Sequence, residues 1–199
     1  MTFEEMAYTR QSNRKYDASK EVEMEKLIKI CEVAMLAPSA CNSQPWKLHI
    51  VKDNKEQVDS LRKSCQVVGL NKFLNDVNAF IVVEQVFGNS SAKLGSTFSK
   101  NDLNSIDIGI LTSYITFQAL ELGLGTCILG AFRKDKIIQA MGFKKKQVIR
   151  IVVAVGYPTD DDIIRKKVRK SKDVVITIQK WSSITFFVNI YIFFIFIYT

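Results

Sequence analysis

The segment from Ile106 to Leu122 constrains the fold most, because it is apolar on nearly every side. A helix that faces water carries one apolar stripe and one polar face, so a helix without a polar face must be covered by the rest of the protein. Gly123 follows directly and is a residue type that commonly ends helices. We therefore expect a central, buried helix around which the other elements pack.

A second helix is expected between Glu21 and Ala37, where apolar residues return at intervals of three and four. Ser19 is its expected N-cap, and Pro38 is expected to stop it because proline disfavours helical geometry in the preceding residue. Two further amphipathic helices are expected at Lys55–Val67 and Lys134–Met141. The chain is thus predicted to be rich in helices that bury one face.

Strands are expected where β-branched residues gather. Trp46 to Ile50 alternates apolar and polar residues, which places His49 on the more polar face. Ala79–Val86 and Val148–Pro158 are continuous apolar runs typical of interior strands, and Gly123 to Gly130 is expected to be a turn. Helices and strands alternate without an internal repeat, which predicts one α+β domain.

Histidine and cysteine usage limits the chemistry of the chain. The 199 residues include one histidine, His49, and four cysteines whose spacing does not fit a zinc site. We therefore expect no metal site, and an enzyme of this composition would take its chemistry from a cofactor. The cysteines are expected to be free thiols in a reducing compartment. The polar N-terminus lacks the apolar core of a signal peptide, which favours the cytoplasm.

The net charge of +8 is concentrated late in the chain. Residues 133–172 contain thirteen basic and four acidic residues. Such a stretch is either a solvated basic face or a site for anions such as phosphate groups. Aromatic residues do not alternate with these lysines, so nucleic-acid binding is not expected.

Four stretches of the sequence, taken in order, resemble motifs of one protein family. TRQSNRKYD resembles the family's opening Arg-x-Ser-x-Arg motif, and APSACNSQPW, residues 37–46, matches its Ala-Pro-Ser-x-x-Asn-x-Gln-Pro-Trp loop. Asp107 and Gly109, followed later by GLGTCILG, resemble the central helix and the turn after it. GYP, with Arg169 and Lys170 further on, resembles the closing motif. Together these motifs resemble those of the FMN-dependent nitroreductase family, and the resemblance covers residues 3–181.

This resemblance implies a three-layer sandwich with a mainly antiparallel mixed sheet flanked by helices, assembled as an interlocked homodimer. It also implies an oxidoreductase with a ping-pong reaction, in which NAD(P)H passes hydride to FMN N5 and a nitroaromatic, quinone or similar small-molecule acceptor then takes it. Residues 1–181 would form the FMN-binding domain.

The resemblance also implies which residues contact FMN. Arg10, Ser12, Arg14, Arg169 and Lys170 would hold the phosphate, since guanidinium and ammonium groups suit a dianion. A partner protomer would bring the residues that pack on or bond the ring: Pro38, Ser39, Ala40, Asn42 and Gln44. Leu129, Gly130 and Ala131 would lie near N5, with no catalytic side chain, because hydride transfer is the cofactor's chemistry.

The sequence departs from the family pattern at a few positions. The best-known nitroreductases have an acidic residue at the position of Gly130, and relatives often have arginine at the position of Gln11. Cys41 and Cys127 lie beside the expected flavin site and are expected to be packing cysteines.

The apolar stretch 182–199 has no counterpart in the family and carries no charge. A helix over its apolar part would span about 22 Å, which is short for a membrane anchor.

Four other functions stay open on the sequence alone. These are a specialised flavin enzyme of the same fold, such as a dehalogenase; a flavin-binding protein without turnover; a nucleic-acid-binding module suggested only by net charge; and a protein anchored in a membrane by its C-terminal tail.

Overall fold

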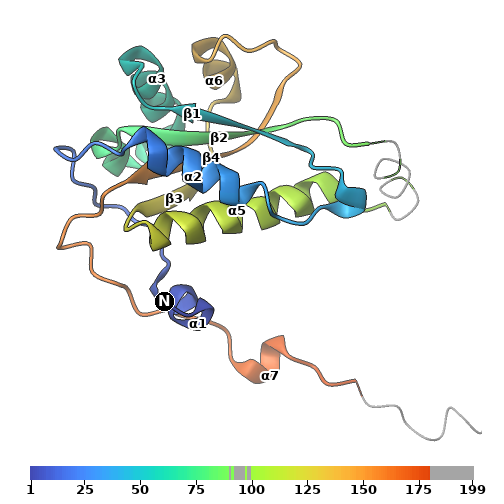
Figure 1. Cartoon of the computed structure of the whole chain (residues 1–199). Coiled ribbons are helices and arrows are strands. Elements are labelled where there is room, and N and C mark those ends of the chain that lie inside the picture. Colours follow the sequence, from blue (N-terminus) through green and yellow to red (C-terminus); the bar gives the residue numbers. More distant parts are fainter. Residues whose placement is uncertain (90, 92–96, 98–99, 180–199) are drawn as a thin grey trace, which may run out of the picture. The chain divides into compact units, whose positions relative to one another are not determined.

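A computed structural model of the chain describes residues 1–89, 91, 97 and 100–179 (Figure 1). Contacts divide the chain into two units, Met1–Arg165 and Lys166–Thr199. The second unit contains a short helix, α7 (Lys172–Val175). The predicted tail, residues 182–199, lies outside the described residues, so the expected domain of residues 1–181 stays a prediction.

A four-stranded sheet forms the centre of the first unit. Its strands are β1 (Trp46–Val51), β2 (Ala79–Gln85), β3 (Gly125–Leu129) and β4 (Val148–Gly156), in the order β1-β2-β4-β3. All neighbouring strands pair antiparallel, and a parallel bridge joins Ser12 to Thr126. The two central strands, β2 and β4, are those predicted as interior strands.

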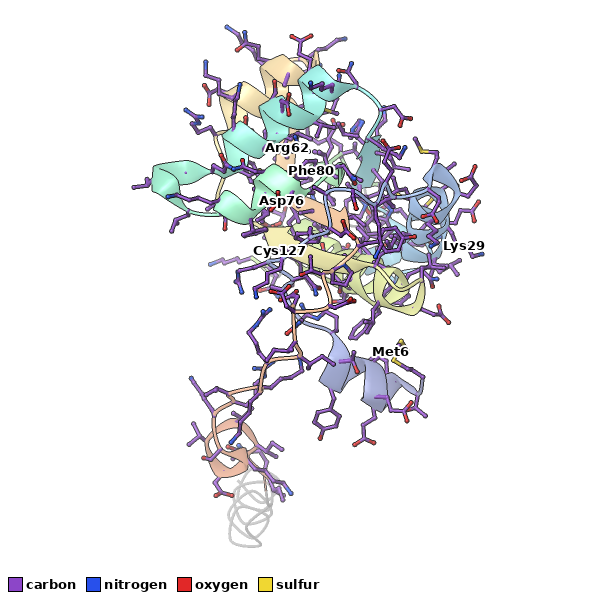
Figure 2. The ribbon with its side chains drawn as sticks, turned by 90° about the vertical axis from the view of Figure 1, so that its left-hand side faces the viewer. Met6, Lys29, Arg62, Asp76, Phe80 and Cys127 are labelled. Carbon is purple, nitrogen blue, oxygen red and sulfur yellow. The ribbon has the colours of Figure 1, made fainter. Side chains whose placement is uncertain are left out.

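Helices cover both faces of this sheet. Helices α2 (Met24–Ala34) and α5 (Leu103–Glu121) pack on the face that carries Ile81 and Val83. Helices α3 (Lys55–Cys65) and α6 (Lys134–Ala140) cover the opposite face, which carries Phe80 and Val82. Figure 2 shows α2, marked by Lys29, and α3, marked by Arg62, on opposite sides of the strands. The predicted α+β three-layer sandwich is confirmed.

Helix α5 is the expected central helix, although one side of it is open. Ile108, Leu111 and Ile115 are fully or almost fully buried, and the helix ends before Gly123, whose φ of +76° suits glycine. Ile106 remains 54% exposed and Tyr114 37% exposed. The prediction that the rest of the chain covers this helix on all sides is therefore wrong for the single protomer.

The expected turn at Gly123–Gly130 contains strand β3, so that prediction is wrong. The segment is short and bounded by glycines, which locally looks like a turn. Its five residues become a strand because each has a partner on β4, from Gly125 opposite Gly156 to Leu129 opposite Val152. That pairing is a tertiary contact and has no local signature.

Two predicted helix ends also differ from the structure. Ser19 does not cap α2, because its hydroxyl donates to Asp17 Oδ1 over 2.5 Å in a separate turn. The helix ends at Ala34, four residues before Pro38. A further helix, α1 (Phe3–Thr9), was not predicted, although Thr2 and Glu5 form a capping box that marks its start.

His49 lies among polar side chains, as predicted, but these side chains form a largely buried network. The His49 Nε2 lies 2.8 Å from Glu84 Oε2, and its ring packs on Phe143 with centroids 4.6 Å apart. Gln147 Nε2 donates to the other Glu84 oxygen over 2.8 Å. The chain that follows α6 covers this part of the sheet. The polar groups that it covers are paired with one another through hydrogen bonds.

Candidate functional site

The first part of the site is an extended segment, residues 10–16, beside the edge strand β3. The Asn13 N–H donates to the Thr126 carbonyl over 2.8 Å, and Tyr16 bridges to Pro158. In an extended chain successive side chains point to opposite sides. Gln11 and Asn13 donate hydrogen bonds to the backbone carbonyl and the side-chain carboxylate of Asp162, which holds residues 162–165 alongside this segment.

Three arginines and a hydroxyl lie near one sulfur of β3. Cys127 is buried on β3, where Figure 2 labels it, and the Ser12 hydroxyl donates a hydrogen bond to it. The guanidinium groups of Arg10, Arg14 and Arg165 lie close enough to act on this thiol electrostatically. Burial nevertheless raises the pKa of Cys127 above its ordinary value, so the thiol stays neutral at pH 7 and the cluster keeps its positive charge. This arrangement suits an anion.

The second part is the loop of residues 38–44, at the N-terminal end of α5 (Figure 1). The Ala40 N–H donates to both carboxylate oxygens of buried Asp107, over 3.2 and 3.1 Å. Ser39 Oγ accepts from the Gln44 N–H over 2.9 Å, and Gln44 Nε2 donates to Asn42 Oδ1 over 3.0 Å. The exposed side-chain amides of Asn42 and Gln44 therefore belong to a turn that Asp107 of α5 holds in place.

This loop is also strained. Cys41, Asn42 and Gln44 have φ values of 52°, 48° and 47°, a region that costs non-glycine residues about 1 kcal/mol or more. Cys41 is exposed in the single protomer, so its role stays a prediction, whereas Cys127 is buried as expected of a packing cysteine.

The third part is the end of β3. Leu129 is buried, whereas Gly130 and Ala131 are exposed. A Cβ built on Gly130 would meet no atom within 4 Å. Gly130 lies three residues beyond Cys127, or about 10 Å along an extended strand. The exposed backbone of Gly130 therefore lies about 10 Å from Cys127 and the arginines near it.

The structure does not bring the loop and the arginine cluster together in one protomer. Asp107, which holds the loop, and Leu120, which lines a cavity of about 180 Å³ with Arg10, are thirteen residues apart on α5. The rise of a helix makes this about 20 Å. Arg169 and Lys170 belong to the second unit, so their predicted place at the phosphate stays a prediction.

Sequence reasoning missed three residues of this site. Arg165 lies within the basic stretch of residues 133–172 that the charge pattern indicated, but the pattern does not single it out. Asn13 and Asp162, which hold the segment beside β3, had no signal of their own. The hydrogen bonds that place these residues link Asn13 to Asp162, Asn13 to Thr126, and Arg165 to Ser12. Each bond joins residues more than 100 positions apart, which no local sequence pattern can indicate.

The described ranges contain neither a cluster of metal-binding side chains nor a membrane-spanning helix. No group of three or more His, Cys, Asp or Glu side chains is placed there to hold a metal ion. No helix within the same ranges is long and apolar enough to cross a membrane.

The fold and site together define an α+β sandwich with an arginine-rich segment at the edge of its sheet. The model of the Nitroreductase family matches residues 7–68 and 66–157. An Archaeoglobus fulgidus protein named "Putative NADH dehydrogenase/NAD(P)H nitroreductase" is 32% identical over 160 residues, which are 78% of this chain and 85% of that protein. The chain therefore belongs to the nitroreductase family and is an oxidoreductase.

Solved structures are similar over nearly the whole chain. A nitroreductase family protein from Clostridium difficile 630 is 27% identical, with a TM-score of 0.73 and coverage of 91% of this chain and 100% of that one. An FMN-dependent nitroreductase from Clostridium difficile R20291 is also 27% identical, with a TM-score of 0.66 and coverage of 88% and 98%.

Proposed function

We propose that this chain is an FMN-dependent NAD(P)H oxidoreductase that works as a homodimer. The observation that carries the proposal is that Arg10, Ser12 and Arg14 all interact with the same thiol of β3, that of Cys127. Guanidinium forks and a hydroxyl are donors that suit a phosphate monoester. The similar Clostridium difficile R20291 protein is FMN-dependent, which supports the choice of ligand.

The space around β3 fits the rest of that cofactor. From the arginine cluster, about 10 Å of strand leads to Gly130, a distance that a ribityl chain can cover. The empty surroundings of Gly130 leave room for a flat ring system against the backbone. Leu129 is buried in the core just before this position, which anchors the end of β3.

FMN, when bound, supplies a two-electron carrier, so the protein needs no ionisable side chain at the reacting atoms. In our proposal the chain's part is to bind and orient. Arg10 and Arg14 fix the phosphate, and the exposed backbone of Gly130 and Ala131 offers N–H donors at the ring. NAD(P)H and a flat acceptor such as a quinone or nitroaromatic would use the same open space in turn, which is the ping-pong order.

A second protomer would complete the site. The loop of residues 38–44 lies about 20 Å from the arginine cluster along α5, so in one protomer it cannot easily serve the same ligand. The open side of α5 carries exposed Ile106 and Tyr114, and Phe3 and Phe117 help to line an apolar cavity of about 250 Å³ there. Such a patch marks an interaction surface. A copy docked on it would bring its own loop to the partner's site.

Replacing Arg14 tests the phosphate assignment. One hydrogen bond to a charged group contributes about 1.5–3 kcal/mol, so Arg14→Ala should weaken FMN binding about tenfold or more. Titration of the apoprotein, followed by flavin fluorescence, measures the affinity. The matched control is Arg150→Ala, because Arg150 pairs with Asp102 and Gln85 instead. Unchanged FMN affinity in both Arg10→Ala and Arg14→Ala would contradict the assignment.

Anaerobic addition of NADH or NADPH to the FMN-loaded protein tests turnover separately. Bleaching of the flavin absorbance, followed by recovery with a quinone, is the expected result. A protein that binds FMN but keeps its absorbance with both nucleotides would instead be a flavin-binding protein without turnover.

A further inference from the structure

The segment of residues 158–165 runs alongside the arginine-bearing segment and is held to it side chain by side chain. Gln11 Nε2 donates to the carbonyls of Asp162 and Ile163, over 3.3 and 3.2 Å. The Arg165 N–H donates back to Gln11 Oε1 over 3.0 Å. Lys15 Nζ lies 2.6 Å from Asp161 Oδ2 at the other end. The path of this irregular segment is therefore set by the first segment.

A buried carboxylate lies at the centre of these contacts. The Asp162 side chain is only 3% exposed. Its Oδ2 accepts from Asn13 Nδ2 over 2.8 Å, and its Oδ1 accepts from Arg165 Nη1 over 3.1 Å. Asn13 is itself fixed, because its Oδ1 accepts from the Thr126 N–H over 3.1 Å. Asp162 therefore ties one arginine to β3 through Asn13.

These contacts fix where the Arg165 guanidinium lies. Nη1 is held by Asp162, and Nη2 donates to the carbonyl of Ser12, the residue whose hydroxyl lies beside Cys127. A guanidinium has five N–H donors in a rigid plane. Two of them are used in these bonds, so others are left for a ligand at the Ser12 hydroxyl.

We propose that Arg165 is a phosphate-binding residue of the site and that Asp162 is the positioning residue that holds it there. The proposal rests on the function proposed above and deepens it. Charge supports it: Arg10, Arg14 and Arg165 contribute +3 and Asp162 contributes −1. The resulting +2 matches a phosphate monoester, which carries about −1.5 to −2 at neutral pH.

Comparing FMN with riboflavin isolates the phosphate contribution, because the two ligands differ only in that group. Arg165→Ala should weaken FMN binding by the full-length protein about tenfold and leave riboflavin binding unchanged. Arg165→Lys keeps the charge but loses the fork, so its FMN affinity should fall between those of the parent and Arg165→Ala.

Asp162→Asn tests the positioning role. Removing a negative charge near a phosphate would by itself strengthen FMN binding. If Asp162 positions Arg165, FMN binding should instead weaken at least threefold, and in Arg165→Ala the further change Asp162→Asn should not weaken it again. Tighter FMN binding by Asp162→Asn would overturn the positioning role.

Lys15→Ala is the matched control, since Lys15 joins the same two segments away from Ser12, and it should change neither affinity. Equal losses of FMN and riboflavin in Arg165→Ala would mean that Arg165 only holds the segments together, which would overturn the inference. A parent protein that binds FMN no better than riboflavin would contradict the proposed function itself. If the parent prefers FMN to riboflavin and Arg165→Ala keeps the same preference, the role of Arg165 is overturned while the proposed function stands.

Discussion

Cys65 shows how strongly burial alone changes one residue. Its side chain is fully buried between α3 and the sheet, and this burial raises the pKa of its thiol from 9.0 to about 12. Between pH 9 and about pH 12, the Cys65 thiol therefore loses its proton in the unfolded chain but keeps it in the folded chain. The unfolded state then binds fewer protons, so the free energy of unfolding falls as pH rises.

We therefore expect the parent to lose stability from about pH 9 upward, and Cys65→Ala to lose less of its own stability over the same range. Urea unfolding at pH 8.0 and at pH 10.5 measures the difference, with each protein compared with itself so that the lost methyl-sized volume cancels. Parallel losses in the two proteins would show that Cys65 does not titrate in this way.

At the scale of the element, α5 does more than fill the core. Its first turns present Asp107 to the Ala40 N–H, and that contact holds a loop with three residues at positive φ. Such strain persists only where surrounding contacts enforce it. The helix is therefore the support of the polar loop, and the register between them decides where Asn42 and Gln44 project.

Asp107→Ala should release this loop without unfolding the protein, because most of the buried face of α5 is aliphatic. We expect hydrogen exchange at the Ala40 amide to become at least tenfold faster, which corresponds to about 1.4 kcal/mol of lost protection. Asp107→Asn keeps an oxygen acceptor and should retain most of the protection. Exchange as slow in Asp107→Ala as in the parent would show that other contacts hold the loop.

At the scale of the whole molecule, the open side of α5 is an exposed apolar surface of the first unit, where Ile106 and Tyr114 face solvent. An aspartate at Ile106 would place a charge in the proposed dimer interface, where an unpaired charge costs several kcal/mol. Ile106→Asp should therefore be monomeric in sedimentation velocity and should retain less FMN after ultrafiltration. Leu70→Asp, at a similarly exposed apolar residue that follows α3, is the control and should stay dimeric. A parent that sediments as a monomer with full FMN content would contradict the shared site.

The sequence by itself determined the elements whose residues share one environment. Local patterns of apolar residues predicted the apolar helix α5, the interior strands β2 and β4, and the amphipathic helices α3 and α6. They did so because side chains of a helix or strand return to the same face at a fixed interval, so the buried positions recur at that interval. Arg10, Ser12 and Arg14 had a different source, because they were predicted from the resemblance of their segment to the family's opening motif and not from periodicity.

Only the tertiary structure decided the contacts between distant segments. Strand β3 is a strand because β4 lies beside it, and His49 is half-buried because Glu84 and Phe143 meet it from other elements. Arg165 joins the arginine cluster through residues about 150 positions earlier. These features depend on which surfaces the fold brings together, and no periodicity within a short stretch of sequence carries that information.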